Sequence, residues 1–258
     1  MATYFYALRS ALFVLFMAVT VVPWALAVLV VSIFARGNTV YRLCVSWLTL
    51  SIWGAKVICG VHARLHGMDR LPDYPVVLLP KHQSTWETFA FPGLMPHPLC
   101  YVFKRELLYI PFFGWAMARM DMIHIDRSKR AQAWNLVAEQ GRKFMDKGHW
   151  VIMFPEGTRA ARGGRGVYKA GGTRLAITTG RPVLPVAVTS GRCWPRKSFI
   201  LRPGVIDLSV GHPIESTGRE PDELMREVET WIEAEMRRLD PEAYPASEPV
   251  AAAGAIKA

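Results

Sequence analysis

A long stretch without charge near the N-terminus constrains this chain most. The 26 residues between Arg9 and Arg36 carry no charged side chain, and residues 11–34 are almost wholly apolar. A helix over residues 11–34 would be about 36 Å long, enough to cross a hydrocarbon core of about 30 Å. Pro23 lies in the middle and predicts a kink or a division into two shorter helices. Gly and Asn at 37–38 predict a helix end and a turn.

A second apolar stretch follows at residues 40–60. Only 13 uncharged residues separate Arg42 from Lys56, which is short for a membrane span. We therefore expect an interfacial helix, with Trp47 and Trp53 as anchors at the level of the lipid headgroups.

A cleaved signal peptide is the alternative interpretation of this N-terminal region. Residues 25–27, Ala-Leu-Ala, have the small-x-small form of a cleavage site. The apolar run continues to residue 34, however, well beyond a signal-peptide core of about 7–15 residues, so we expect the segment to be retained. Basic residues at 36, 42, 56 and 64 favour the cytoplasmic side for the chain beyond the first helix. Whether the first helix spans the bilayer or dips into one leaflet stays open.

The charge of the chain is unevenly distributed. The net charge is +10; residues 1–212 carry 26 basic and 10 acidic side chains, and residues 213–258 carry 5 basic and 11 acidic ones. A basic body beside an apolar N-terminus suits an anionic membrane surface and a phosphorylated substrate. We expect no nucleic-acid partner, because no nucleic-acid-binding motif accompanies the charge.

The four cysteines are far apart in the sequence and form no Cys-x-x-Cys pair. This spacing predicts free, chemically idle thiols in a reducing compartment and no metal site. The cysteines are Cys44, Cys59, Cys100 and Cys193.

From residue 61 onward, short apolar runs alternate with helical patterns. Residues 61–66 alternate apolar and polar, so His62 and His66 share the exposed face of a strand; a metal pair would need a third ligand nearby. The other predicted strands are residues 74–79, 99–103, 122–125, 150–154, 183–189 and 205–210. The predicted helices are residues 130–147, 171–179 and the amphipathic segment 222–239.

Strands alternating with helices predict an α/β fold with a mixed, mostly parallel sheet flanked by helices. We expect three regions along the chain. A membrane-associated helical pair or transmembrane segment occupies residues 1–60, the α/β domain residues 61–240, and a flexible tail residues 241–258.

His82 lies just beyond the predicted strand 74–79, where α/β folds place ligands. Five residues of a helix rotate by about 140°, so His82 and Glu87 would face apart on one regular helix. If His82 precedes the helix and Ser84 caps it, Glu87 lies in the first turn and reaches the imidazole. Ser84 to Glu87 is also a capping-box match, in which Glu87 would only bond the Ser84 backbone. Both interpretations stay open.

A second polar segment, Phe-Pro-Glu-Gly-Thr-Arg at 154–159, ends the predicted strand 150–154. Gly157 permits close approach of the backbone, and Arg159 offers a bidentate fork for phosphate. The cations that come next, in a Gly-rich loop, are Arg162, Arg165 and Lys169. They shape an anion site or belong to a solvated loop.

Together these segments resemble the glycerophospholipid acyltransferase family, and most closely the bacterial 1-acyl-glycerol-3-phosphate acyltransferases. Residues 82–87 resemble the family's His-x4-Asp motif, with Glu87 where the family usually has Asp. Residues 154–159 are similar to its Glu-Gly-Thr-Arg block. The other matching segments are residues 104–107, 110–114 and 125–127 for the second block, and 183–186 for the fourth.

The resemblance implies an enzyme that moves a fatty acyl group from an acyl thioester, either acyl-CoA or acyl carrier protein, to the 2-hydroxyl of 1-acyl-glycerol-3-phosphate (lysophosphatidic acid). Phosphatidic acid would be the product. The implied location is the bacterial inner membrane, with the catalytic domain on the cytoplasmic side and membrane lipids as partners. No cofactor beyond the thioester co-substrate is expected.

Acyl transfer to an alcohol needs a base for the hydroxyl proton, and His82 suits that role. Glu87 would hold the imidazole tautomer, and a backbone N–H such as that of Gly157 would stabilise the oxyanion. We expect direct transfer, because Ser84 is not part of a Gly-x-Ser-x-Gly elbow. The implied substrate-binding residues are Lys104, Arg127, Glu156, Gly157, Thr158 and Arg159.

Three other functions compete with this one. Within the same enzyme class, the acceptor could be another lysolipid, such as an amino-acid-linked one. A lysolipid or thioester hydrolase would use water in place of the alcohol. A membrane-binding protein could keep the fold without catalysis, although His82, Glu87 and residues 156–159 speak against it.

Overall fold

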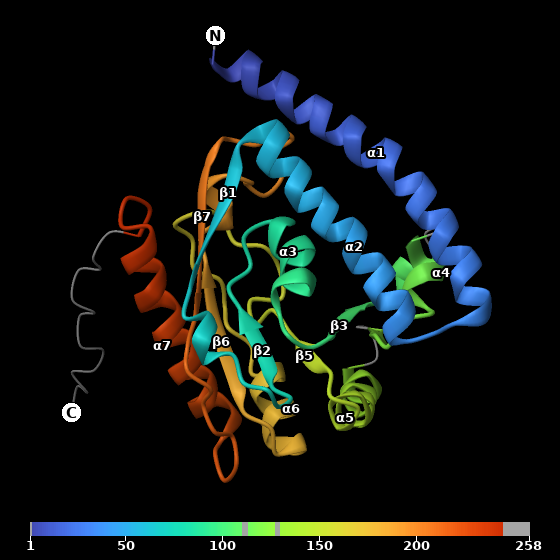
Figure 1. Cartoon of the computed structure of the whole chain (residues 1–258). Coiled ribbons are helices and arrows are strands. Elements are labelled where there is room, and N and C mark those ends of the chain that lie inside the picture. The colour runs from blue at the N-terminus through green and yellow to red at the C-terminus, as the bar shows by residue number, and fades with distance from the viewer. Residues whose placement is uncertain (1, 110–112, 127–129, 245–258) are drawn as a thin grey trace.

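The computed structural model of the chain describes residues 2–109, 113–126 and 130–244. Helix α1 (Ala2–Phe34) runs through Pro23 as one helix, so the predicted division there does not occur. Gly37, at φ 61°, turns the chain into α2 (Asn38–Gly54), which continues as the π-helical turn η1 (Ala55–Cys59). The two helices form a hairpin along one side of the molecule (Figure 1).

Both helices of this hairpin are long and apolar enough to cross a membrane. The candidate spans are Thr3–Phe34 and Asn38–Cys59, with mean hydropathies of 2.7 and 1.3. The second helix therefore extends beyond the uncharged stretch between Arg42 and Lys56, from which a helix too short for a span was predicted. The two apolar helices are consistent with association with a membrane.

The described residues form a seven-stranded sheet in the order β1-β7-β6-β2-β5-β3-β4. The strands are β1 (Val61–His66), β2 (Val77–Pro80), β3 (Leu99–Lys104), β4 (Ile123–Ile125), β5 (Trp150–Ile152), β6 (Val183–Val188) and β7 (Gly204–Val210). Neighbours from β6 through β4 pair in parallel, β7 is antiparallel to β6, and β1 is parallel to β7. The predicted mixed, mostly parallel sheet is confirmed.

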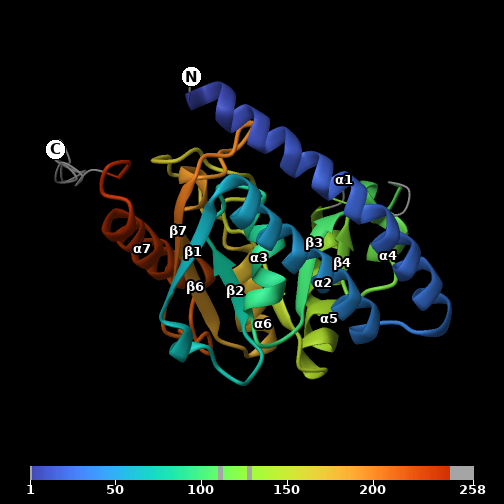
Figure 2. The same ribbon diagram turned by 45° about the horizontal axis from the view of Figure 1, so that its top comes forward.

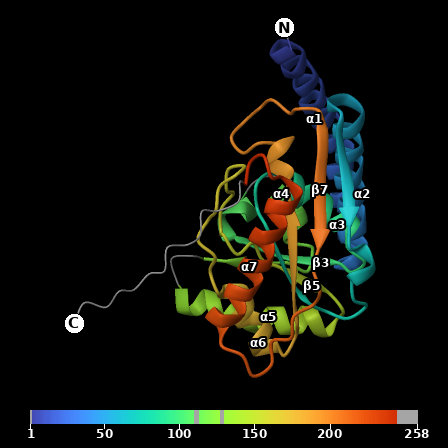
Figure 3. The ribbon, with the colours of Figure 1, turned by 90° about the vertical axis from the view of Figure 1, so that its left-hand side faces the viewer.

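Helices cover both faces of the sheet. The remaining α-helices are α3 (Trp86–Leu94), α4 (Phe113–Met117), α5 (Arg130–Asp146), α6 (Gly171–Thr179) and α7 (Pro221–Leu239). Short helical turns are η2 (Met68–Arg70), η3 (Arg105–Tyr109) and η4 (Ser190–Arg192). Figures 2 and 3 show α1, α2 and α3 on one side of the sheet and α5, α6 and α7 on the other.

Strand β2 shows how one strand supports two cores. Leu78 belongs to the core that also contains residues of α1 and α3, whereas Val77 and Leu79 belong to the core that contains residues of α5, α6 and α7. All three side chains are fully buried. A parallel strand covered on both faces needs such a continuous apolar run, because successive side chains point to opposite faces.

The N-terminal hairpin is part of the first core. Phe13 of α1 is 1% exposed and packs edge-to-face on Trp194, with ring centroids 5.5 Å apart. Trp47, expected to face the headgroups, instead donates to the Thr20 hydroxyl at 3.1 Å and packs against Phe89 of α3. It therefore joins the hairpin to the domain, because its indole N–H finds a partner inside the protein. Trp53 does lie exposed.

The C-terminal segment stays ordered beyond α7. The backbone N–H groups of Ala243 and Tyr244 donate to the Asp240 carbonyl, and the Tyr244 side chain is buried. Residues 241–244, predicted as the start of the tail, thus lie against the end of α7 and the core. Residues 245–258 lie outside the described part.

Candidate active site

The predicted motifs meet at one edge of the sheet. β2, β5, β3 and β4 run in parallel, so their carboxyl ends share that edge. His82 follows β2, the segment 154–159 follows β5, and Lys104 ends β3. This is the edge at which open α/β sheets place their ligands. Arg127, expected to follow β4 as a substrate ligand, lies outside the described residues.

His82 and Glu87 lie within ion-pair distance. His82 Nδ1 is 3.5 Å from Glu87 Oε2, and Glu87 is fully buried in the first turn of α3. His82 Nδ1 is buried and forms no hydrogen bond with any described residue. The His82 ring stacks on Phe154, with centroids 3.8 Å apart and planes 22° apart, which fixes the imidazole at the strand exit.

Glu87 also caps the start of α3. Its Oε2 accepts from the Ser84 backbone N–H at 2.9 Å, and its Oε1 from the Gln83 N–H at 3.0 Å. The Ser84 hydroxyl accepts from the Trp86 N–H at 2.9 Å, although the helix begins one residue later than expected. Glu87 therefore does both things that the sequence offered as alternatives: it lies beside the His82 imidazole, and it bonds the Ser84 backbone.

Ser190 also contacts Glu87 and was missed in the sequence. Its hydroxyl donates to Glu87 Oε1, and the residue is fully buried in η4, directly after β6. A single serine at a strand exit carries no pattern that could have identified it. Its hydrogen bond adds to the two backbone bonds that fix the carboxylate.

An open cavity of about 520 Å³ lies beside His82. Its lining is His82, Val102, Ile125, Trp134, Val137, Met153, Phe154, Pro155, Gly157, Lys169, Gly171 and Gly172. The lining is largely apolar, with the imidazole and the Lys169 ammonium as its ionisable groups. An apolar cavity with a few polar groups at one place suits a substrate that has an acyl chain and a polar reacting end.

Gly157 cannot supply the oxyanion N–H in the way the sequence suggested. Its N–H donates to the Phe154 carbonyl at 3.0 Å and is therefore occupied. Gly157 is at φ 66°, and a Cβ atom at this position would lie 3.3 Å from Lys169 Nζ. The glycine is thus required for the turn and for the close approach of Lys169.

Glu156 faces the interior, which differs from its predicted role as a substrate ligand. Its carboxylate accepts from Lys81 Nζ at 2.9 Å, from the His82 N–H at 3.1 Å and from the Gly166 N–H at 3.0 Å. A buried carboxylate with these partners has its acceptor sites occupied by the protein. Glu156 therefore positions the backbone of His82.

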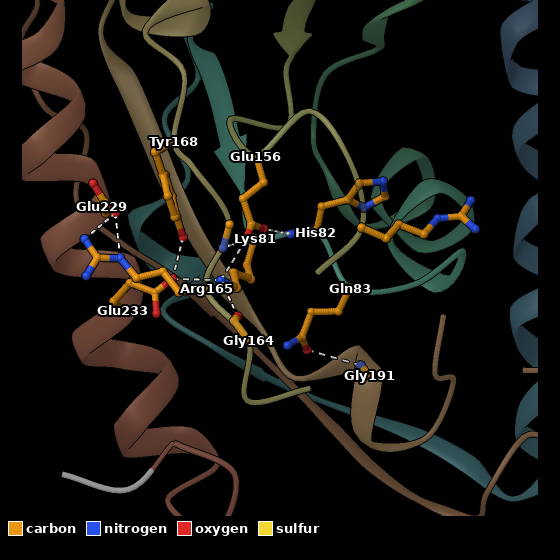
Figure 4. A network of polar contacts seen from close by, with 12 residues as sticks. Lys81, His82, Gln83, Glu156, Gly164, Arg165, Tyr168, Gly191, Glu229 and Glu233 are labelled. Atoms are coloured by element: carbon orange, nitrogen blue, oxygen red, sulfur yellow. Dashed lines mark hydrogen bonds and ion pairs between the residues drawn. The ribbon is translucent and has the colours of Figure 1, made fainter. Parts of the chain in front are cut away.

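Lys81 links this carboxylate to the C-terminal helix. Its fully buried ammonium donates to Glu156 at 2.9 Å, to Glu233 of α7 at 2.7 Å and to the Gly164 carbonyl at 3.2 Å (Figure 4). The Tyr168 hydroxyl donates to Glu233 at 2.8 Å, and burial raises the pKa of this tyrosine. The residue before His82 is therefore held by two segments distant in sequence, the loop after β5 and α7.

Apart from Lys169, the cations singled out in the Gly-rich loop form ion pairs with carboxylates. Arg162 forms a two-pronged contact with Asp240, at 2.6 and 2.7 Å, and Arg165 contacts Glu229 of α7 at 2.6 and 2.8 Å. These ion pairs favour a structural role for both arginines over the anion site considered from the sequence. The C-terminal segment also reaches the loop that follows β2, because Gln83 donates to the Tyr244 hydroxyl; Gln83 also accepts from the Gly191 N–H.

Lys104, Thr158 and Arg159 lie near the same edge but do not belong to the cavity lining. Lys104 and Thr158 are exposed, and Arg159 is half-buried, with its carbonyl accepting from the Arg196 guanidinium. Among the ionisable residues predicted to act on substrate, the structure thus places His82 at the cavity, with Glu87 buried behind it.

The described residues include no cluster of three side chains that could bind a metal ion. His66, for which a solvated face was expected, contacts Asp207 at 2.9 Å. The four cysteines are free thiols, and burial raises the pKa of Cys193 to about 11.

Comparisons with known proteins agree with this arrangement. Residues 62–189 match the Acyltransferase family model. The chain is 38% identical over 239 residues to the 1-acyl-sn-glycerol-3-phosphate acyltransferase of Pseudomonas aeruginosa, covering 91% of this chain and 93% of that protein. It is 28% identical over 203 residues to the 1-acyl-sn-glycerol-3-phosphate acyltransferase alpha of Mus musculus, covering 77% and 70%.

The fold is also that of a solved structure. The crystal structure of the 1-acyl-sn-glycerophosphate acyltransferase from Thermotoga maritima is similar with a TM-score of 0.76 at 22% identity, over 93% of this chain and 99% of that one. With the family match and the relative at 38% identity, the chain belongs to the same acyltransferase family as these enzymes.

Proposed function

We propose that this acyltransferase moves a fatty acyl group from an acyl thioester to the 2-hydroxyl of 1-acyl-glycerol-3-phosphate and so forms phosphatidic acid. The names of the similar enzymes support this acceptor. One observation carries the chemistry: the His82 imidazole lines an apolar cavity and has a buried carboxylate 3.5 Å behind Nδ1. The donor is acyl-CoA or acyl carrier protein, and the reaction takes place on the cytoplasmic side of the bacterial inner membrane.

His82 acts as the general base. With Nδ1 toward Glu87, the Nε2 atom on the opposite side of the ring is left for the acceptor hydroxyl. Nε2 takes the hydroxyl proton while the oxygen attacks the thioester carbonyl; the carbon–sulfur bond then breaks, and the leaving thiolate takes the proton from the imidazolium. Glu87 stabilises the transient positive charge, as the carboxylate of a catalytic triad does.

Lys169 stabilises the oxyanion in this mechanism. The Gly157 N–H is occupied, whereas the Lys169 ammonium lies beside the Gly157 backbone and lines the same cavity as His82. A fixed positive charge near the developing oxyanion lowers the barrier to the tetrahedral intermediate. Arg159, and with it Lys104, binds the acceptor phosphate at the rim of the site.

The environment of Ser84 supports direct transfer without an acyl-enzyme. Its hydroxyl is fully buried and accepts a hydrogen bond from the start of α3, so an acyl group has no access to it. None of the four cysteines is part of the described cavity lining. The acceptor oxygen is then the nucleophile that attacks the donor.

Product analysis of the purified full-length protein tests the proposal. Labelled acyl-CoA and labelled acyl carrier protein are each supplied with 1-acyl-glycerol-3-phosphate, an amino-acid-linked lysolipid, a phosphate-free monoacylglycerol or no acceptor. We expect labelled phosphatidic acid only with the first acceptor. Labelled free fatty acid in every sample would indicate a hydrolase, and a product with another lysolipid alone would change the acceptor. The His82→Ala variant controls for a contaminating enzyme.

A further inference from the structure

The loop at residues 195–203, between η4 and β7, is attached to the third and fourth turns of α1. The Leu201 N–H donates to the Ser10 hydroxyl at 2.9 Å, and Trp194, just before the loop, packs on Phe13. Figure 1 shows the segment that leads into β7 beside the N-terminal part of α1. These contacts place the loop beside residues 9–13 of α1.

The tip of this loop is basic and aromatic. Lys197 and Arg202 are exposed, and Phe199 between them is 53% exposed. The sequence from residue 157 to residue 206 contains ten Lys and Arg residues and no acidic residue. An exposed aromatic ring flanked by cations is typical of a surface that contacts lipid headgroups.

At this height α1 changes from an interfacial to an apolar composition. Tyr4 and Phe5 are exposed, and Arg9 is the last charged residue before the uncharged stretch 11–34. Tyrosine and arginine at the end of an apolar helix mark the boundary between water and hydrocarbon. The loop 195–203 thus lies where headgroups would surround α1.

We propose that the loop 195–203 is a second membrane contact that binds an anionic bilayer surface. Phe199 enters the headgroup layer, and Lys197 and Arg202 bind lipid phosphates. Charge complementarity favours this occupant, because the chain from residue 157 to residue 206 carries no acidic side chain beside these two cations. The contact continues the apolar face of α1 and does not depend on which lysolipid is acylated.

The loop also connects the membrane surface with the candidate site. The Arg196 guanidinium donates to the carbonyl of Arg159, the proposed ligand of the acceptor phosphate. A loop seated among headgroups would therefore hold Arg159 near the level at which the phosphate of a membrane-embedded lysolipid lies.

A nitroxide label measures the depth of the loop directly. The full-length chain carries Cys44→Ser and Phe199→Cys, since the other three cysteines are buried. A matched control carries Arg226→Cys on the exposed side of α7, across the sheet from α1. In vesicles of phosphatidylcholine and phosphatidylglycerol, the label at 199 should collide more with oxygen than with a water-soluble nickel chelate, and the label at 226 should show the reverse. Equal, aqueous behaviour of both labels would overturn the proposal.

Charge reversal tests the anionic part of the proposal. Phosphatidylglycerol should draw the label at 199 deeper than phosphatidylcholine alone does. Lys197→Glu with Arg202→Glu should abolish this difference, whereas Arg226→Glu should preserve it. A label whose depth does not depend on phosphatidylglycerol, or still depends on it in the double variant, would contradict headgroup binding by these two cations.

Discussion

The Glu87 carboxylate lies 3.5 Å from His82 Nδ1 and at the same time accepts hydrogen bonds from the backbone N–H groups of Gln83 and Ser84, just before α3. The position of the imidazole and the fold of residues 82–87 therefore depend on one side chain. The Glu87 side chain is one methylene longer than that of Asp. This length is compatible with the double role, because α3 begins only at Trp86 and Glu87 lies in its first turn.

Glu87→Gln should reduce activity and stability together. The amide nitrogen of Gln would meet backbone donors at Gln83 or Ser84, which predicts a loss of about 1–3 kcal/mol in the free energy of unfolding. The analogous change in a catalytic triad costs about 10⁴-fold in kcat, and the 3.5 Å separation here predicts a smaller loss of about 10- to 100-fold. Thermal melts and kcat measure both. Ser190→Ala is the control, since it removes one hydrogen bond and keeps the charge. A normal kcat with reduced stability would restrict Glu87 to capping.

Lys81→Met should destabilise the protein more than Glu233→Gln at its partner does. It leaves two carboxylates, Glu156 and Glu233, buried without their cation, for which about 3–5 kcal/mol is expected. Glu233→Gln keeps the Lys81–Glu156 pair and should cost about 1–3 kcal/mol. Glu229→Gln, one turn away on α7, breaks only an exposed pair and should cost about 0–1 kcal/mol. Melting curves of the three variants in detergent should show this order, and equal stability would contradict the buried network.

Lys169→Met should lower kcat by about 10²- to 10³-fold, because a charge beside the oxyanion acts mainly in the transition state. Lys169→Arg keeps the charge and should retain much of the activity. Lys143→Met, an exposed lysine on α5, is the matched control and should be silent. Steady-state kinetics with saturating donor measure these effects. A rise in KM for the acceptor at unchanged kcat would instead make Lys169 a phosphate ligand.

Arg159→Lys should raise KM for lysophosphatidic acid much more than KM for the acyl donor. The substitution keeps a positive charge but loses the bidentate fork, a loss of about 1.5–3 kcal/mol or about 10- to 150-fold in kcat/KM. A phosphate-free acceptor should be poor with the wild-type protein and lose little more in the variant. An equal loss with that acceptor would assign Arg159 to the fold or to the donor.

The parts of the fold that could be predicted are those with a local pattern. The bounds of α6 match the prediction, and α7 begins one residue earlier than the amphipathic pattern, at Pro221. Strands β2 and β5 are shorter than the predicted runs 74–79 and 150–154, and β2 extends one residue further than predicted, to Pro80. The hairpin was predicted as a membrane element, but its burial of Phe13 in the core follows only from tertiary packing.

The candidate site was predictable where chain order decides it. His82 and the segment 154–159 share an edge because each follows a parallel strand. The partners of the buried groups were not predictable, because the Lys81–Glu233 contact joins residues 152 positions apart and Ser190 lies in no motif. The occupied Gly157 N–H depends on the local turn at Phe154, which the residue types do not specify.

The rate of the His82→Ala variant tests the central claim most directly. Initial rates of phosphatidic acid formation from labelled acyl-CoA and lysophosphatidic acid are compared with the wild type, with melting temperature and vesicle association as controls. Loss of the general base predicts a fall of about 10²- to 10⁴-fold in kcat/KM. Both controls should be unchanged, because His82 lies in a loop and its imidazole takes no part in capping α3. A folded, membrane-bound His82→Ala variant with a rate near that of the wild type would contradict the account.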